Sequence, residues 1–98
     1  MNQKDQQLLL KPYIKPNVMS STEEDRILLY DVVSGNVCRI TGVGTRIWEL
    51  CDGKRTIDDI VKVIIEEYDA PKETLVADAL EFIRAMARRG FILVKDNL

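Results

Sequence analysis

The sequence predicts one small α+β domain in which a three-stranded antiparallel sheet is followed by three helices. Three observations support this prediction. Short runs rich in β-branched and aromatic residues, separated by glycine and asparagine turns, fill the first half. Apolar residues recur at helical spacing through the second half. A composition of 46% hydrophobic and 31% charged residues is that of a folded chain, not a disordered one.

The first half contains three expected strands. Residues 13–21 include Pro16, which cannot donate a ladder hydrogen bond, so they form an edge or irregular strand. Residues 26–33, RILLYDVV, form the clearest strand. The turn SGN at 34–36 leads into VCRIT at 37–41, which pairs back as the third strand.

The second half contains three expected helices. Thr41 is a candidate cap for the first helix and Gly53 suits its end. Thr56 caps the second helix. The third helix runs over about 71–89, and 91–95 then form a short strand or an extended tail. Trp48, in the first helix, is expected to pack in the core or at its edge.

Charge and composition limit the partners and the compartment. A net charge of −2 gives no general attraction to nucleic acid or anionic lipid, and no apolar run is long enough to cross a membrane. The N-terminus lacks a secretory signal pattern, so we expect a cytoplasmic protein. Residues 1–12 are expected to be a flexible tail, and residues 13–98 the folded domain.

The residues that commonly carry catalysis are missing. The chain has no histidine, so Ser-His-Asp and Cys-His arrangements are impossible. Cys38 and Cys51 are too few for a structural zinc site and are interpreted as buried thiols. The GVG at 42–44 lacks the further glycine of a phosphate-binding loop. We therefore expect neither an enzyme nor a cofactor.

A DNA-binding regulator is the alternative function, because strands plus three helices are also the inventory of a winged helix-turn-helix. The third helix would then be the recognition helix. Its first half is acidic, and Arg84, Arg88 and Arg89 come late in it. Counterion release requires basic residues at the DNA surface, so the charges argue against nucleic acid, and salt-dependent DNA retention would separate the two functions.

A peptide-binding surface fits the pattern better. Three strands leave an open edge, where an incoming peptide can add as a strand. The third helix carries two apolar rows, at positions 75, 79, 82 and 86 and at 76, 80, 83 and 87. One row could border a groove beside the strands, and the alternative is that both rows belong to the core.

The segments "GVGTRIWELCDGKRT", "IDDIV", "EEYDAP", "DALEFI" and "RRGFI" occur in this order between about residues 25 and 94. In this order they closely resemble the PqqD-like proteins, the precursor-peptide recognition elements. The pattern is specific for the fold, because it places the Trp48 helix, the Thr56 cap and the Arg-Gly helix end in sequence. One departure is Ala70, where the family often has a better capping residue before the third helix.

The resemblance implies a peptide chaperone that binds the leader segment of a ribosomally made precursor and presents it to a modifying enzyme. That enzyme would be a radical S-adenosylmethionine protein or a leader peptidase. The leader would add antiparallel to the third strand and lie against an exposed row of the third helix. The implied contacts are Val37, Cys38, Arg39, Ile40, Thr41, Val76, Asp78, Ala79, Leu80 and Ile83, with Asp78 pairing a basic leader residue.

Two further readings stay open. The chain could be a purely structural subunit that is fused to its enzyme in relatives and has no peptide contact of its own. Exposed strand edges in this family can also be shared between copies, which leaves a strand-exchanged homodimer open.

Overall fold

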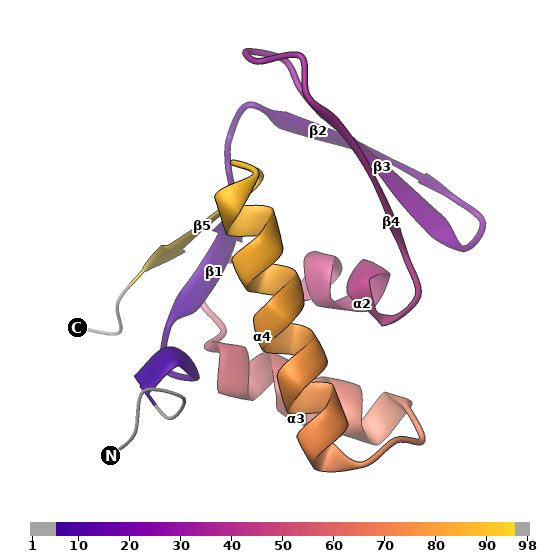
Figure 1. The fold of residues 1–98 in the computed structure, drawn as a ribbon, viewed down its shortest axis with the longest axis vertical. Helices are drawn as coiled ribbons and strands as arrows, with labels where there is room; N and C mark the ends of the chain where they lie inside the picture. The colour runs from indigo at the N-terminus through magenta and orange to yellow at the C-terminus, as the bar shows by residue number, and fades with distance from the viewer. Residues whose placement is uncertain (1–5, 96–98) are drawn as a thin grey trace.

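The structure is a computed structural model that describes residues 6–95 and has the predicted α+β architecture (Figure 1). One sheet has the order β2-β3-β4, and a second pairs β1 with β5. The strands are β1 (Lys11–Ile14), β2 (Val18–Glu23), β3 (Arg26–Asp31), β4 (Val37–Thr41) and β5 (Ile92–Lys95). The helices are α2 (Val43–Leu50), α3 (Ile57–Glu67) and α4 (Lys72–Arg88).

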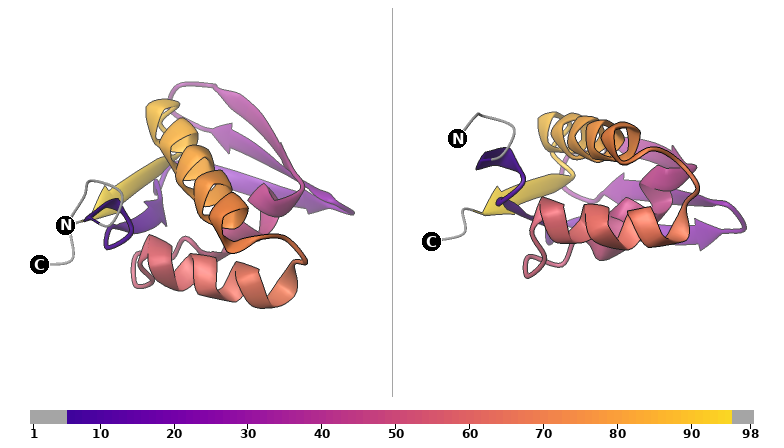
Figure 2. Two further views of the ribbon diagram at one scale, coloured as in Figure 1. Left: turned by 60° about the horizontal axis from the view of Figure 1, so that its bottom comes forward. Right: turned by 90° about the horizontal axis from the view of Figure 1, so that it is seen from below.

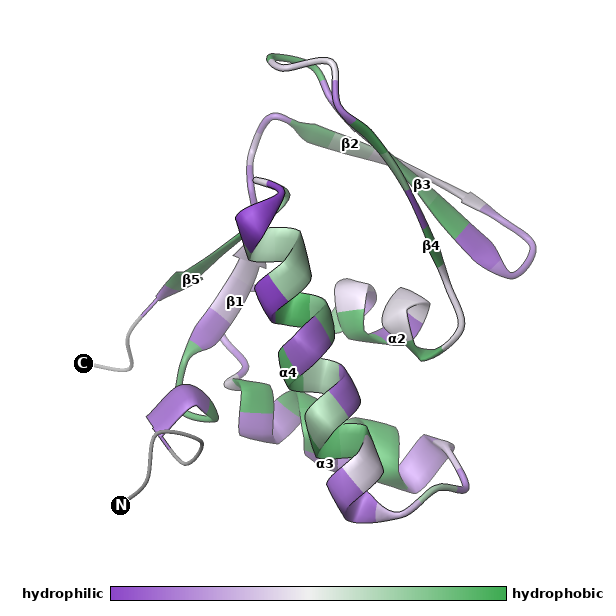
Figure 3. Ribbon diagram, in the orientation of Figure 1, coloured by the Kyte–Doolittle hydropathy of each residue, from purple (hydrophilic) through white to green (hydrophobic). Residues whose placement is uncertain are grey.

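Helix α4 lies between the β1–β5 pair on one side and the three-stranded sheet with α2 on the other (Figure 1). Both views of Figure 2 keep this order, with α3 packed against α4. Hydrophobic and hydrophilic segments alternate along α4 (Figure 3), as expected for a helix with an apolar face in the core. In residues 6–95, no helix is both long and apolar enough to span a membrane.

The strand expected at 13–21 is divided between the two sheets. Ile14 ends β1, where it pairs with Ile92, and β2 begins only at Val18. Pro16 lies between them, and the Val18 amide donates to the Lys15 carbonyl at 3.0 Å to close a turn. The missing N–H of proline therefore falls where the chain leaves one sheet for the other. Of the two alternatives for 91–95, a short strand or an extended tail, the structure has the strand, β5.

The expectation of a flexible tail over 1–12 is wrong for its described part. Leu8 and Leu10 pack against the core. Their carbonyls accept hydrogen bonds at 2.9 Å from the amides of Asp58 and Ile57 respectively, in the first turn of α3. This segment therefore satisfies two donors that a helix start leaves unpaired. Residues 1–5 lie outside the described part of the chain.

Local signals placed one helix start correctly and one incorrectly. Thr56 caps α3 as expected, and Asp59 completes a capping box with it that was not predicted from the sequence, with both hydrogen bonds at 3.0 Å. Thr41, by contrast, does not cap α2: it ends β4, and Gly42 is the N-cap, with φ at 65°. A glycine can adopt this left-handed conformation at little cost, and it turns the chain from strand into helix.

The β3–β4 loop is organised by the buried carboxylate of Asp31. One of its oxygens accepts from the Asn17 side chain and from the amides of Val33 and Ser34. The hydrogen bond from the Val33 amide lowers the pKa of Asp31 the most, against desolvation, which raises it. Asp31 thereby ties the turn before β2 to the loop from which β4 starts.

Both cysteines are free and buried, which confirms that they are packed thiols. The Cys51 thiol donates to the Ile47 carbonyl at 3.2 Å, and burial raises its pKa to about 12. Trp48 is also in the core, as expected.

Replacing Asp31 with asparagine should make stability less sensitive to acid. Because the folded-state pKa is lowered, the ionised carboxylate stabilises the fold above the ordinary value of 3.8, and this contribution disappears as the pH falls through the folded-state pKa. Urea unfolding from about pH 5 to about pH 2 measures this, with Asp69→Asn as an exposed control. Equal acid-induced losses in Asp31→Asn and the unmodified protein would refute the role given to this carboxylate.

Cys51 should be unreactive in the native protein. With a pKa of about 12, only about one thiol in ten thousand is a thiolate at pH 8. In a Cys38→Ser variant, a maleimide should therefore label Cys51 only as fast as the protein unfolds, and label it fully in denaturant. Labelling much faster than unfolding would contradict the packing described for this thiol.

Candidate functional site: the open edge of β4

Strand β4 is an edge strand whose backbone hydrogen bonds alternate in direction. The Asp31 amide donates to the Asn36 carbonyl at 2.9 Å, so the antiparallel register makes the next bonded pairs Leu29–Cys38 and Ile27–Ile40. The backbone groups of Cys38 and Ile40 are therefore used by β3.

The N–H and C=O groups of the alternate residues, Val37, Arg39 and Thr41, point away from β3. We call these outward groups the β4 edge. No strand within residues 6–95 pairs with it. The opposite side of β3 agrees with this assignment, because the Val32 amide donates to the Asn17 carbonyl and so directs the alternate β3 residues to β2.

The side chains of β4 alternate between the two faces of the sheet. Cys38 and Ile40 are buried on the face toward the helices, whereas Val37, Arg39 and Thr41 are exposed on the outer face. A strand added at the β4 edge would thus have one set of side chains facing the helices and one set facing outward.

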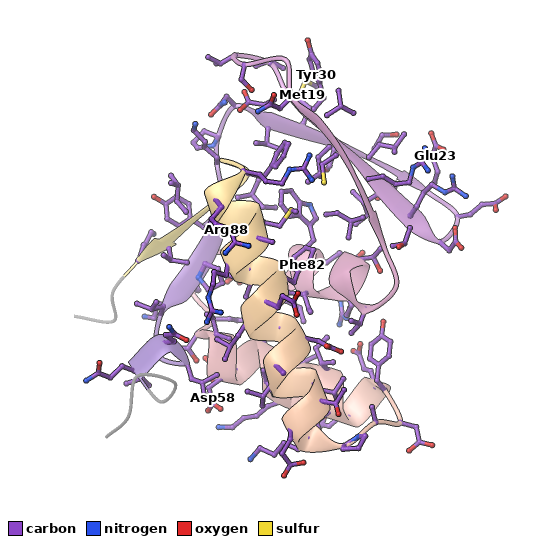
Figure 4. All side chains as sticks on the ribbon, viewed as in Figure 1. Met19, Glu23, Tyr30, Asp58, Phe82 and Arg88 are labelled. Carbon is purple, nitrogen blue, oxygen red and sulfur yellow. The ribbon has the colours of Figure 1, made fainter. Side chains whose placement is uncertain are left out.

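Helix α4 runs antiparallel to β4 beside this edge. At one end, the Arg89 guanidinium donates to the Val37 carbonyl at 3.3 Å and to Cys38 Sγ at 3.1 Å. At the other, a Cβ at Gly44 would lie 2.9 Å from the Phe82 ring and 3.0 Å from Ile40, so Gly44 leaves the space that Phe82 fills. Figure 4 shows Phe82 between α4 and α2.

Three residues of helical spacing run from Phe82 along α4 toward the start of β4. Phe82 and Ala85 are half-buried, and Arg89, the C-cap residue of α4, is exposed. We call Phe82, Ala85 and Arg89 the α4 row. Sequence reasoning assigned Arg89 only to the helix end and missed Ala85, although their spacing from Phe82 was a usable signal.

The expected exposed row of α4 is wrong. Val76, Ala79, Leu80 and Ile83 are 7%, 1%, 9% and 3% exposed and belong to the core. Leu80 and Ile83 also line an apolar hollow of about 200 Å³ that includes Leu10 of the N-terminal segment. The N-terminal segment covers one side of α4, and helices α2 and α3 cover other sides. Most residues of both predicted apolar rows are therefore buried against these neighbours. Asp78 is exposed, one helical turn before Phe82.

A second apolar surface lies on the outer face of the sheet. Met19, Tyr30 and Val37 face one another across the three strands and are 64%, 48% and 62% exposed. Figure 4 shows Met19 and Tyr30 together at this end of the sheet. This patch reaches the β4 edge at Val37.

The carboxylates with lowered pKa values lie outside the β4 edge. The carboxylates with lowered pKa values, Asp31, Asp52, Asp59 and Glu67, owe them to hydrogen bonds in turns, a cap and an ion pair away from the β4 edge. The pKa of Glu67 is lowered by the Arg46 guanidinium, which donates to the two carboxylate oxygens of Glu67 at 2.9 Å and 3.0 Å. What the β4 edge presents is a set of backbone donors and acceptors beside an apolar and cationic row.

Comparison with known proteins gives a family match over residues 26–92, to the family described as Coenzyme PQQ synthesis protein D (PqqD). A curated relative, the "PqqA binding protein" of Bradyrhizobium diazoefficiens, is 26% identical over 50 residues, which are 51% of this chain and 48% of the relative. The chain thus matches about half the length of that relative.

Two solved structures share the fold over most of their length. "TbiB1 in Complex with the TbiA(beta) Leader Peptide" is 29% identical with a TM-score of 0.75, covering 82% of this chain and 93% of that one. "Lasso peptide synthetase B1 complexed with the leader peptide" is 14% identical with a TM-score of 0.76, covering 85% and 98%. At that lower identity, the second likeness shows the fold alone.

A third structure, the heterocyclase TruD, contains the same fold as a small part of a longer chain. It is 18% identical with a TM-score of 0.61, and the match covers 88% of this chain but 12% of TruD. The family match extends from the start of β3 to the start of β5 and spans more than half of the sequence. The chain therefore belongs to the PqqD family.

Proposed function

We propose that the protein binds the leader segment of a ribosomally made precursor peptide by strand addition at the β4 edge. The observation that carries this proposal is the outward direction of the backbone groups of Val37, Arg39 and Thr41. A relative named for binding PqqA and a similar structure solved with a leader peptide support the class of ligand.

The β4 edge is a better site than the other open edge of the same sheet. Strand β2 is exposed along most of its length, and its Val18 amide already donates to the Lys15 carbonyl. Beside β4, in contrast, the α4 row offers an aromatic ring and a guanidinium within reach of the strand. A guest at β4 would therefore bury apolar surface as well as form backbone hydrogen bonds.

Tight binding requires both the backbone hydrogen bonds and the burial of apolar side chains. Two backbone hydrogen bonds at each of the three outward residues would contribute about 6 kcal/mol if each is worth about 1 kcal/mol. Association costs about 4 to 15 kcal/mol in lost freedom, so backbone pairing alone gives weak binding at most. Side chains packed against the α4 row must supply the remainder, and they also give the site its sequence preference.

An antiparallel guest would place its side chains in a defined way. Guest residues opposite Cys38 and Ile40 would direct their side chains toward the α4 row, and those opposite Val37, Arg39 and Thr41 would face outward. Among the contacts expected from the sequence, we retain the β4 residues. The buried residues of α4 instead hold the helix in place.

The proposal also includes a leader contact at Asp78 and a modifying enzyme as the second partner. Asp78 is exposed one turn before Phe82 and would meet a basic residue toward the N-terminal side of the guest. The bound leader would be presented to a modifying enzyme of the same pathway, a radical S-adenosylmethionine protein or a leader peptidase. We place this activity in the cytoplasm, where free thiols such as Cys38 and Cys51 remain reduced.

An Arg39→Pro variant should lose leader binding and keep its fold. Proline removes an outward N–H but no bond between β3 and β4, and its ring occupies the β4 edge. Peptides enriched on the unmodified protein from a random-sequence display library provide the probe. Calorimetry should show at least about tenfold weaker binding to Arg39→Pro, from the lost donor and the steric block together.

Two matched variants serve as controls for Arg39→Pro. Arg39→Ala keeps the N–H and should bind nearly as well as the unmodified protein, whereas Cys38→Pro removes an inward donor and should lower the free energy of unfolding instead. Undiminished binding to a folded Arg39→Pro protein, or a library from which no peptide is enriched, would contradict strand addition at β4.

A further inference from the structure

Arg89 holds an unusual position for a residue at a helix end. A basic residue there ordinarily interacts with the last carbonyls of its own helix. The Arg89 side chain instead reaches β4, donating through Nη2 to the Val37 carbonyl at 3.3 Å and through Nη1 to Cys38 Sγ at 3.1 Å. Its guanidinium also lies over the Phe91 ring, 5.6 Å from the ring centre. These contacts fix a planar fork at one end of the β4 edge.

The charge of this fork is not balanced by a nearby carboxylate. The ion pairs within residues 6–95 involve Arg26, Arg46, Arg55 and Lys62, and none involves Arg89. Arg88, the next residue in the chain, is also basic and exposed. A peptide that covered the guanidinium would remove it from water, and a carboxylate on that peptide would offset the cost through charge-assisted hydrogen bonds.

The register identifies which guest residue would carry that carboxylate. The side chain opposite Cys38 lies on the same face as Cys38, whose sulfur is within hydrogen-bonding distance of Arg89. In an antiparallel guest, the residue opposite Ile40 comes two positions earlier. That earlier side chain would lie near Ile40 and the Phe82 ring, where an apolar group fits.

We propose that Arg89 is a specificity determinant that selects leader peptides with an aspartate or glutamate two positions after an apolar residue. This inference rests on the proposed strand addition at β4. Arg89 need not leave its place when the guest binds, because the Val37 carbonyl has two lone pairs and can accept from Arg89 and from a guest amide.

Parallel selections from a random-sequence display library test the preferred sequence. Peptides enriched on the unmodified protein should share an apolar residue followed two positions later by an acidic one. On Arg89→Gln the acidic preference should disappear while the apolar preference remains. Arg88→Gln, which changes the adjacent exposed arginine, serves as the matched control and should keep both preferences.

The affinities of one enriched peptide and its variant then measure the interaction between Arg89 and the acidic residue of the peptide. Changing its acidic residue to the corresponding amide should weaken binding to the unmodified protein about fivefold at low salt, and less at high salt. The same change should alter binding to Arg89→Gln less than about twofold, since the partner charge is gone. Thermal unfolding of Arg89→Gln checks that the variant is folded.

The outcomes separate this inference from the proposed function. If enriched peptides lose binding to Arg39→Pro yet show no acidic preference that depends on Arg89, strand addition stands and the role of Arg89 is refuted. If their binding is insensitive to Arg39→Pro, the proposed site itself is refuted, and the inference with it.

Discussion

The alternation of backbone hydrogen bonds along β4 is the constraint on which the proposed site depends. Because Asp31 and Asn36 form a bonded pair, the register commits Cys38 and Ile40 to β3 and directs Val37, Arg39 and Thr41 outward. A shift of one residue would reverse both the direction of these groups and the burial of the side chains. Burial of Cys38 and Ile40 therefore fixes the register of β4, and with it the backbone groups that point outward.

The distance between β4 and α4 is maintained at both ends of the strand. Near its end, Gly44 admits the Phe82 ring beside Ile40, and near its start, Arg89 bridges from α4 to Val37. Asp31 holds the loop from which β4 begins. Strand, helix and loop are thus positioned by contacts that leave the outward edge of β4 unpaired with any strand within residues 6–95, although its Val37 carbonyl accepts from Arg89.

Features set by local chemistry were predictable from the sequence, and features set by distant contacts were not. The clearest strand, the Thr56 cap and the buried Trp48 follow from neighbouring residues alone. The hydrogen bond from Ile57 to Leu10 joins residues far apart in the chain, so the N-terminal segment could not be seen as a helix cap. For the site, β4 was predictable from its alternation.

The face of α4 beside β4 was not predictable, because an apolar stripe does not reveal which of several neighbours will cover it. Val76 and Leu80 had the right spacing for an exposed row, yet packing on other sides of the helix buries them. Thr41 and Gly42 both suit a helix start, and the choice between them depended on the turn out of β4, which glycine makes with positive φ.

Amide hydrogen exchange, followed by NMR with and without an enriched leader peptide, tests the central claim most directly. In the free protein, the amides of Cys38 and Ile40 should be protected, and those of Val37, Arg39 and Thr41 should exchange fast. Bound peptide should slow exchange at these three outward amides by an amount that follows its affinity. Strand addition at the β4 edge would be contradicted if the outward amides were already protected in the free protein, or if peptide binding did not slow their exchange.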